Sequence, residues 1–173
     1  MRRFTLILAV WIALSFTMAA TAQTKSAMSS GSSDKQKIEA LYQAYSKAFN
    51  AKDVNAIMAA YDPKDLFVFD LVPPREYPSW NAYKKDWEAL FVAMPGPVKS
   101  DMSEVAITVV GPVAYARNIQ TGYFTSGDGT RIDLAVRVTD VLHKVNGRWL
   151  IVQEHVSVPV DLATGKPDFM SKP

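Results

Sequence analysis

Two stretches near the C-terminal end alternate between apolar and other residues, which is the period of a β-strand. In residues 131–143 one row holds apolar side chains and a single acid, Asp140, and in residues 148–158 the matching row holds Glu154. A carboxylate in an apolar row is costly unless it is paired, hydrogen-bonded or neutral. Two such acids on neighbouring strands predict a cavity lined by these rows, not a filled core.

The connection between the two strands decides whether their apolar rows share a face. A two-residue turn at 146–147 pairs even-numbered positions with odd-numbered ones and puts the rows on opposite faces, whereas a three-residue loop at 145–147 pairs even with even. Since burying both rows together makes better use of the apolar area, we predict the longer loop. The pairs that it sets are Asp140 with Val152, Glu154 with Val138 and, on the outer face, Arg137 with His155.

Upstream of these strands the apolar spacing changes mostly to that of helices. Turn and capping residues bound each helical segment, so helices are predicted over 34–51, 54–61 and 80–94, with N-caps Asp34, Asp53 and Ser79. Strands are predicted over 65–71, 102–110, 113–124, 131–143 and 148–158.

This order of elements predicts an α+β fold. We expect a cone-shaped, curved antiparallel sheet wrapped around the long first helix. Three helices precede a run of four strands, and one further strand lies between helices 2 and 3. The open mouth of such a cone is a common place for a ligand pocket.

The first 22 residues have the pattern of an export signal. Arg2 and Arg3 precede an apolar run that ends at Met18, and Ala20-Thr21-Ala22 has the form of a cleavage site. A retained membrane anchor is the alternative, but the run is short for a bilayer span. We therefore predict a periplasmic or secreted protein with a signal peptide over 1–22, a flexible linker over 23–33, one domain over 34–160 and a loose tail over 161–173.

Composition narrows the set of partners. The chain has 19 basic and 17 acidic residues, and the predicted signal removes two arginines, so no basic excess argues for nucleic acid. With no cysteine and only His143 and His155 as histidines, the sequence is a poor source of metal ligands. We expect no metal, no cofactor and no membrane contact after cleavage.

The order of elements and the last hairpin resemble the nuclear transport factor 2-like superfamily, in its SnoaL-like branch. The resemblance covers about residues 36–159. Its most specific part is VLHKVNGRWLIVQEHVSVP, which is similar to the closing hairpin of the SnoaL-like group and of the calcium/calmodulin-dependent protein kinase II association domain. Members commonly dimerise through the sheet, so the resemblance implies a homodimer through the face that bears Arg137 and His155.

Δ5-3-ketosteroid isomerase belongs to the same superfamily and uses a tyrosine on its first helix, an aspartate base after its first strand and a protonated aspartate on a late strand. Tyr45, Asp70 and Asp140 stand at the matching positions here. The chain departs from that pattern in two places, because the loop at 71–78 is longer and Glu154 replaces an apolar residue. The association domain, in turn, carries an arginine where this chain has Asp140. Steroid isomerisation is therefore not implied.

Each candidate also has a purely structural interpretation. Tyr45 can be a core aromatic residue, Asp70 can cap the turn that follows it, and Asp140 can pair with a buried cation. In the functional interpretation Tyr45 donates a hydrogen bond to the ligand, Asp70 is a general base and Asp140 is a neutral acid. The predicted ligand-binding residues are Glu154, Val138, Val152, Trp80 and Tyr61, with packing on the first helix as the alternative for Trp80.

Two functions remain open. The first, which we favour, is a non-catalytic cavity that binds a small hydrophobic, carbonyl or carboxylate ligand, or an assembly module. The alternative is an isomerase-like or SnoaL-like enzyme that acts on a small apolar carbonyl compound, with Asp70 as the base and Tyr45 and Asp140 stabilising the enolate. The fold alone does not choose between them, because it hosts many functions.

Overall fold

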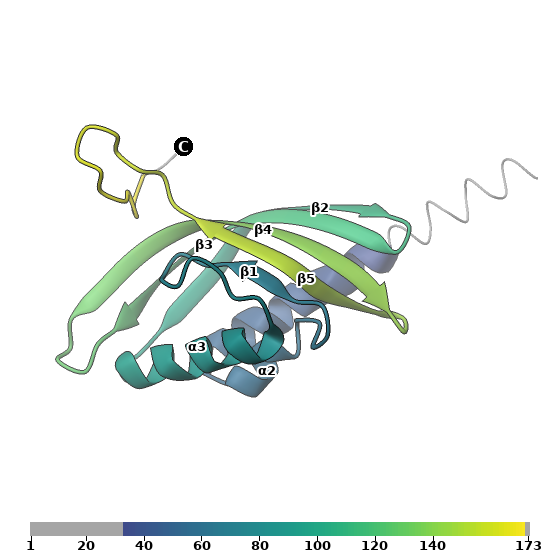
Figure 1. Ribbon diagram of the computed structural model, residues 1–173, viewed down its shortest axis with the longest axis horizontal. Helices are drawn as coiled ribbons and strands as arrows, with labels where there is room; N and C mark the ends of the chain where they lie inside the picture. The colour runs from purple at the N-terminus through teal and green to yellow at the C-terminus, as the bar shows by residue number, and fades with distance from the viewer. Residues whose placement is uncertain (1–32, 172–173) are drawn as a thin grey trace, which may run out of the picture.

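One curved sheet with helices on its concave side makes up the molecule (Figure 1). The computed structural model describes residues 33–171, so the predicted signal peptide and nearly all of the predicted linker lie outside the described residues. The described part of the N-terminal helix covers residues 33–50. The elements that follow are α2 (Val54–Met58), β1 (Phe67–Phe69), α3 (Trp80–Ala93), β2 (Lys99–Val110), β3 (Val113–Thr125), β4 (Arg131–Val145) and β5 (Arg148–Ser157).

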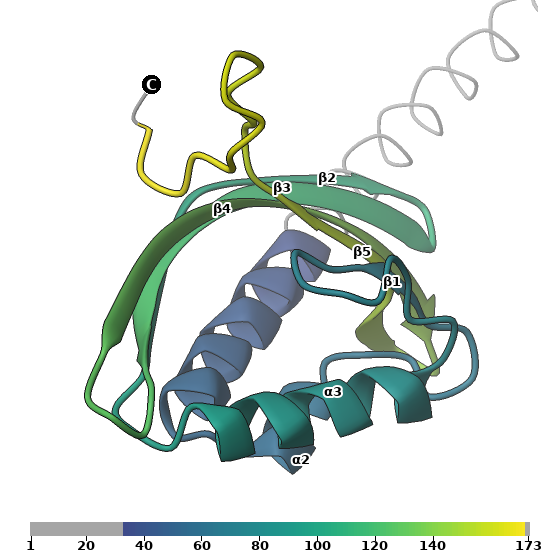
Figure 2. The ribbon, with the colours of Figure 1, turned by 60° about the vertical axis from the view of Figure 1, so that its left-hand side comes forward.

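The sheet has the strand order β1-β5-β4-β3-β2. Strands β2 to β5 pair antiparallel, and β1 joins the outer edge of β5 in parallel. Figure 2 shows this sheet arching over the N-terminal helix, with α2 and α3 across the open side. The predicted α+β cone is confirmed, with one change. The sheet is mixed, because β1 pairs in parallel with β5, from which α3 and the strands β2 to β4 separate it along the chain.

The N-terminal helix fills the arch because its apolar residues recur at helical spacing on one face. Ile38, Tyr42, Tyr45, Ala48 and Phe49 are all buried in the core between this helix and the sheet. No helix within residues 33–171 is long and apolar enough to cross a membrane.

Two of the three predicted helix caps are present. The Ala56 N–H donates to Asp53 Oδ1 at 3.0 Å, and the Ala82 N–H donates to Ser79 Oγ at 3.3 Å. The third prediction is wrong, because residue 33 is already helical and Asp34 therefore lies inside the helix. Its buried carboxylate instead accepts from Lys144 Nζ at 2.8 Å, which ties the helix to β4.

The β4–β5 connection differs from the predicted loop. It is the two-residue turn Asn146-Gly147, in which both residues have positive φ (51° and 80°) and Val145 pairs with Arg148. A register shift follows, because Val141 pairs with Gln153 while Leu142 pairs with Ile151. Val152 is therefore the extra residue of a β-bulge.

The bulge brings both apolar rows to the same face of the sheet, as the predicted three-residue loop would have done. Beyond it, even-numbered positions pair with even-numbered ones, so both acids lie on the concave face. Asp140 pairs with Glu154 and not with Val152, a closer juxtaposition of the two carboxyl groups than predicted. The other corrected pairs are Val138 with Val156, Thr139 with His155 and Arg137 with Ser157.

The C-terminal tail makes contacts that a loose tail would lack. Strand β5 ends opposite Arg137, so β4 has no strand partner on that edge at Ala135. The Ala135 N–H donates to the backbone oxygen of Phe169 at 2.7 Å, and Val160 forms a bridge with Pro167. The tail therefore lies beside β4 beyond the end of β5, and this brings Phe169 to the wall of the cavity described next.

Candidate functional site

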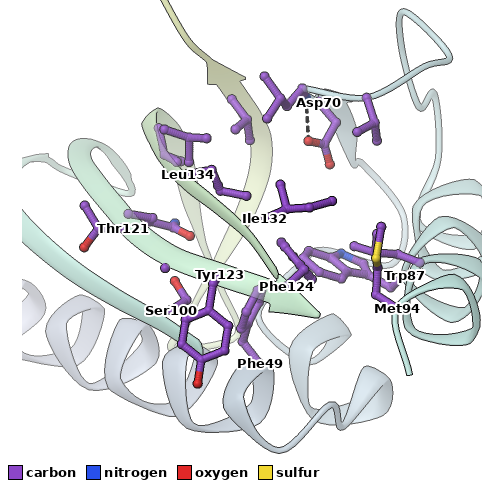
Figure 3. Close-up of a pocket in the computed structure, with 18 of the residues that line it drawn as sticks. Phe49, Asp70, Trp87, Met94, Ser100, Thr121, Tyr123, Phe124, Ile132 and Leu134 are labelled. Atoms are coloured by element: carbon purple, nitrogen blue, oxygen red, sulfur yellow. Dashed lines mark hydrogen bonds between the residues drawn. The ribbon is translucent and has the colours of Figure 1, made fainter. Parts of the chain in front are cut away.

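A cavity of about 230 Å³ lies between the concave face of the sheet, the N-terminal helix and α3. Most of its wall is apolar, as the close-up in Figure 3 shows for Phe49, Trp87, Phe124, Ile132 and Leu134. The volume is below the range usual for drug-sized ligands, so the cavity suits a small molecule.

The acidic side chains in the wall and the two buried tyrosines beside them come from four different parts of the fold. Tyr45 is on the N-terminal helix, Asp70 follows β1, Tyr83 and Asp86 are on α3, and Glu154 is on β5. Lys99 is the one cation among the lining residues, and its ammonium group is paired with Asp101 at 2.9 Å. The part of the cavity wall formed by Asp70, Asp86 and Glu154, called the acidic end below, therefore has more acidic than basic groups.

The Tyr83 hydroxyl lies between two of these acids. It is 2.9 Å from Asp70 Oδ2 and 3.0 Å from Glu154 Oε1. The position follows from the sequence, because Ser79 starts α3 and the helical spacing then buries Tyr83 together with Trp87 on the face toward the sheet. Asp70 is held from its other side by the Leu71 N–H, which donates to Oδ1 at 2.5 Å.

Glu154 is held by a second tyrosine from behind the wall. The Tyr61 hydroxyl donates to the Glu154 carboxyl group, 3.0 Å from Oε2 and 3.1 Å from Oε1. Tyr61 is itself fixed by its bridge to Ile151, and its ring packs edge-on against those of Tyr45 and Tyr83. The glutamate is thus 3% exposed and still fully supplied with phenolic partners.

Asp140 lies one layer deeper than the cavity wall. It is 1% exposed, and the Tyr42 hydroxyl donates to its Oδ2 at 2.6 Å. Its Oδ1 has no hydrogen-bond donor among the described residues, and none of their ion pairs includes it. Its cross-strand neighbour is the carboxyl group of Glu154. The buried cation considered as its alternative partner is therefore not present in the described part of the chain.

Burial sets the protonation of these acids. Desolvation raises the pKa of Glu154 well above its usual value, and the neighbouring Asp140 and Asp70 raise it further. Desolvation also raises the pKa of Asp140 to about 6, although the hydrogen bond from Tyr42 opposes the shift. Desolvation raises the pKa of Asp70 too, against the hydrogen bonds from Leu71 and Tyr83. We conclude that Glu154 is the group most favoured to stay neutral.

The tyrosines of the site remain protonated for the same reason. Desolvation is the largest cause that raises the pKa of Tyr42, Tyr45, Tyr61 and Tyr83, and the nearby carboxyl groups add to it. Each is therefore a hydrogen-bond donor at neutral pH.

The structure places only some of the predicted site residues together. Tyr45, Asp70, Glu154 and Val138 line the cavity. Behind this wall Tyr61 donates to Glu154, and Asp140 faces Glu154 across the strand pair. Two predicted ligand contacts are elsewhere. The Trp80 Nε1–H donates to the Met58 backbone oxygen at 2.9 Å, which fastens α3 to α2, and Val152 is the bulge residue outside the set of lining residues.

Three residues of the site were missed. Tyr83 carries the same signal that selected Tyr45, a tyrosine in an apolar helix stripe, but packing on the first helix is the interpretation that the sequence favours for it. Asp86 stands three positions further on, on the same side of α3. Phe169 carried no sequence signal, because its place depends on where β5 ends.

The comparisons with known proteins agree with this fold. The model of the SnoaL-like domain family matches residues 38–161, so the chain belongs to the SnoaL-like family. A search of curated proteins finds no match.

Three solved structures illustrate the fold. A nuclear transport factor 2-like protein of unknown function from Pseudomonas putida KT2440 is 25% identical, with a TM-score of 0.73 over 82% of this chain and 98% of that one. A ketosteroid isomerase-like protein from Erwinia carotovora atroseptica SCRI1043 is 23% identical, with a TM-score of 0.60 over 69% and 92%. A Xanthomonas campestris protein, provisionally named as a calcium/calmodulin-dependent protein kinase II association domain, is 21% identical, with a TM-score of 0.60 over 69% and 84%.

The buried acids predict an unusual pH dependence of stability. Their folded-state pKa values are raised, so their contribution is complete below the unfolded values of about 4 and is lost as pH rises through the folded values. The free energy of unfolding should therefore fall by roughly 1–3 kcal/mol between about pH 4.5 and pH 7.5, since one pKa unit corresponds to about 1.4 kcal/mol.

Chemical denaturation of the wild type and of Glu154→Gln across this range checks the prediction. The variant should lose less stability as pH rises, because it lacks one titrating group. Glu88→Gln on the exposed side of α3 is the matched control and should behave as the wild type does. Equal stability at both ends of the range in the wild type would contradict the assignment.

Proposed function

We propose that this protein binds a small, neutral, mainly apolar molecule that carries a carbonyl oxygen. The observation that supports this most is the combination of an apolar cavity with an acidic end. Asp70, Asp86 and Glu154 line the cavity, and the single lining cation is already paired. Of the ligand classes expected from the sequence, a carboxylate would meet these acids without a free counter-charge, whereas a carbonyl oxygen needs only a neutral donor.

Glu154 and Tyr45 are the donors that we assign to the ligand oxygen. Both line the cavity, and a neutral carboxylic acid or a phenol donates one hydrogen bond. The hydrocarbon part of the ligand then lies against β4, where Ile132, Leu134, Val136 and Val138 face the cavity. The role of neutral acid that was predicted for Asp140 therefore passes to Glu154, with Asp140 behind it.

Proton transfer to and from the ligand is a second candidate function. The supporting observation is that Asp70 lines the same cavity and has a carboxyl oxygen directed to the Tyr83 that also contacts Glu154. A base and an acid joined through one hydroxyl are the groups required to enolise a carbonyl compound. In this scheme Asp70 removes a proton from the carbon next to the carbonyl group.

We also propose that two copies pair through the outer face of the sheet. Arg137 and His155 are exposed on that face, and the ring of Phe69 packs on His155 with 5.6 Å between centroids. Tyr115 adds a large exposed side chain on β3 (55% exposed). Sedimentation equilibrium of residues 23–173 at micromolar concentration should give a dimer that Arg137→Glu weakens, and a monomer at all concentrations contradicts the pairing.

Binding is tested with two probes of similar shape and different charge. Isothermal titration calorimetry should show binding of cyclohexanone, and binding of cyclohexanecarboxylate should be at least about tenfold weaker at pH 7.5, which corresponds to about 1.4 kcal/mol. Val138→Asp, which places a further charge in the wall, should abolish cyclohexanone binding, and Thr139→Asp on the outer face should not. Preference for the carboxylate would contradict the proposed ligand class.

Proton transfer is tested by exchange. The α-hydrogens of cyclohexanone should exchange with D₂O faster in the presence of the protein, as followed by proton NMR. Asp70→Asn removes the base and should lower the protein-dependent rate about 100-fold or more while the ketone still binds. An unchanged protein-dependent rate in this variant would show that Asp70 is not the base. No acceleration by the wild type would contradict proton transfer and leave the protein as a binding cavity.

A further inference from the structure

The Tyr83 hydroxyl makes one more contact than its proton allows. It lies within hydrogen-bond distance of a carboxyl oxygen of Asp70 and of one of Glu154. A phenol donates one hydrogen bond only, and an ionised carboxylate donates none. Both contacts are hydrogen bonds only if one of the two carboxyl groups is protonated and donates to the Tyr83 oxygen.

We propose that Asp70 and Glu154 hold one proton in common and that Tyr83 relays it between them. In the first arrangement Glu154 Oε1–H donates to Tyr83 Oη, and the Tyr83 hydroxyl donates to ionised Asp70. In the second arrangement protonated Asp70 donates to Tyr83 Oη, and Tyr83 donates to ionised Glu154. The two differ by the concerted shift of two protons, and the total charge is unchanged.

The first arrangement is the resting one. Glu154 is almost completely buried and faces Asp140 across the strand pair, so a negative charge there is opposed by both desolvation and repulsion. Asp70 is half-buried, and its ionised form accepts from the Leu71 N–H as well as from Tyr83. Asp70 is thereby left as a base and Glu154 as an acid.

The relay restores these two roles after a proton transfer, and this part of the inference rests on the proposed function. Asp70 takes a proton from the carbon next to the carbonyl group, so a C–H bond breaks and the enolate forms. When the ligand binds, the Glu154 O–H turns from Tyr83 to the ligand oxygen. Glu154 then gives its proton to the enolate oxygen, so the carboxyl O–H bond breaks and the O–H bond of the enol forms. The site is then in the second arrangement, and the shift through Tyr83 returns it to the first without an external acid or base.

Other titratable groups surround the pair from every side and enter any pH profile of the site. Asp140 faces Glu154 from β4, and Asp86 faces Asp70 from α3. The remaining groups are the hydroxyls of Tyr42, Tyr45, Tyr61 and Tyr77 and the ammonium group of Lys99 at the cavity wall.

The shared proton is tested in the ligand-free protein by infrared difference spectroscopy at pH 7. The carbonyl stretch of one protonated carboxyl group should be present in the wild type and lost in Glu154→Gln. Tyr83→Phe should shift that band, because its hydrogen-bond acceptor is removed. Tyr77→Phe is the matched control, since this neighbouring buried tyrosine donates to the Pro73 backbone oxygen and not to Asp70 or Glu154, and it should leave the band in place. A spectrum in which Glu154→Gln removes no protonated carboxyl band overturns the proposal.

The relay itself is tested by separating binding from exchange. Tyr83→Phe should keep the dissociation constant of cyclohexanone within about threefold of the wild-type value and should lower α-hydrogen exchange about tenfold or more. A merely structural Tyr83 would weaken binding and exchange together, and that result overturns the relay.

These experiments distinguish the two proposals. If the protein does not bind cyclohexanone, the proposed function fails, while the infrared spectra still decide whether the proton is shared. If the ketone binds and exchanges but Tyr83→Phe behaves as Tyr77→Phe does, the relay fails and the proposed function stands.

Discussion

The structure depends on keeping acidic side chains inside an apolar fold. Glu154 and Asp140 face each other on adjacent strands with only a few per cent of their surface exposed. Two ionised carboxylates in this position would be prohibitively costly, so the fold supplies phenolic hydroxyl groups from the helical side and favours a neutral acid. The buried tyrosines resemble ordinary core residues, but their hydroxyl groups make it possible to bury the acids at these positions.

The cavity follows from the same arrangement. The curved sheet and the N-terminal helix would close into a filled core if every inward position carried a large apolar side chain. The acids and their phenolic partners form one part of the cavity wall, and aliphatic residues of β4 form another. A ligand in this cavity contacts mainly hydrocarbon and a small number of hydrogen-bond donors, which is the basis for proposing a small carbonyl compound.

The sequence predicted the architecture and the two inward acids because strand periodicity places Asp140 and Glu154 in apolar rows whatever the turn does. It did not predict that the two acids pair with each other. Their pairing depends on the β-bulge at Val152, and no residue type marks such a bulge in the sequence. The interpretation of the turn was wrong for that reason, although its consequence for the two acids was right. Trp80 was assigned to the cavity because it stands at the start of the third helix, whereas its indole N–H donates to the backbone oxygen of Met58 at the end of α2.

Other parts of the site depend on tertiary structure alone. Asp70 lies at a strand end, where an aspartate is expected both for capping the turn and for catalysis, so the sequence does not distinguish the two roles. In the structure Oδ1 accepts from the Leu71 N–H in the turn, and Oδ2 accepts from Tyr83. The tail reaches the cavity because β4 is longer than its partner strand, a difference that strand patterning does not reveal. Tyr83 became part of the site only when α3 brought it between two acids that are 84 positions apart in the chain.

The most direct measurement of the central claim is a neutron diffraction structure of the perdeuterated protein at pH 7. The account predicts nuclear density for a deuterium atom on Glu154, directed at the Tyr83 oxygen, and a second deuterium on Tyr83 directed at Asp70. Two carboxylates without deuterium, or carboxyl groups of residues 140 and 154 turned out to solvent, would contradict it.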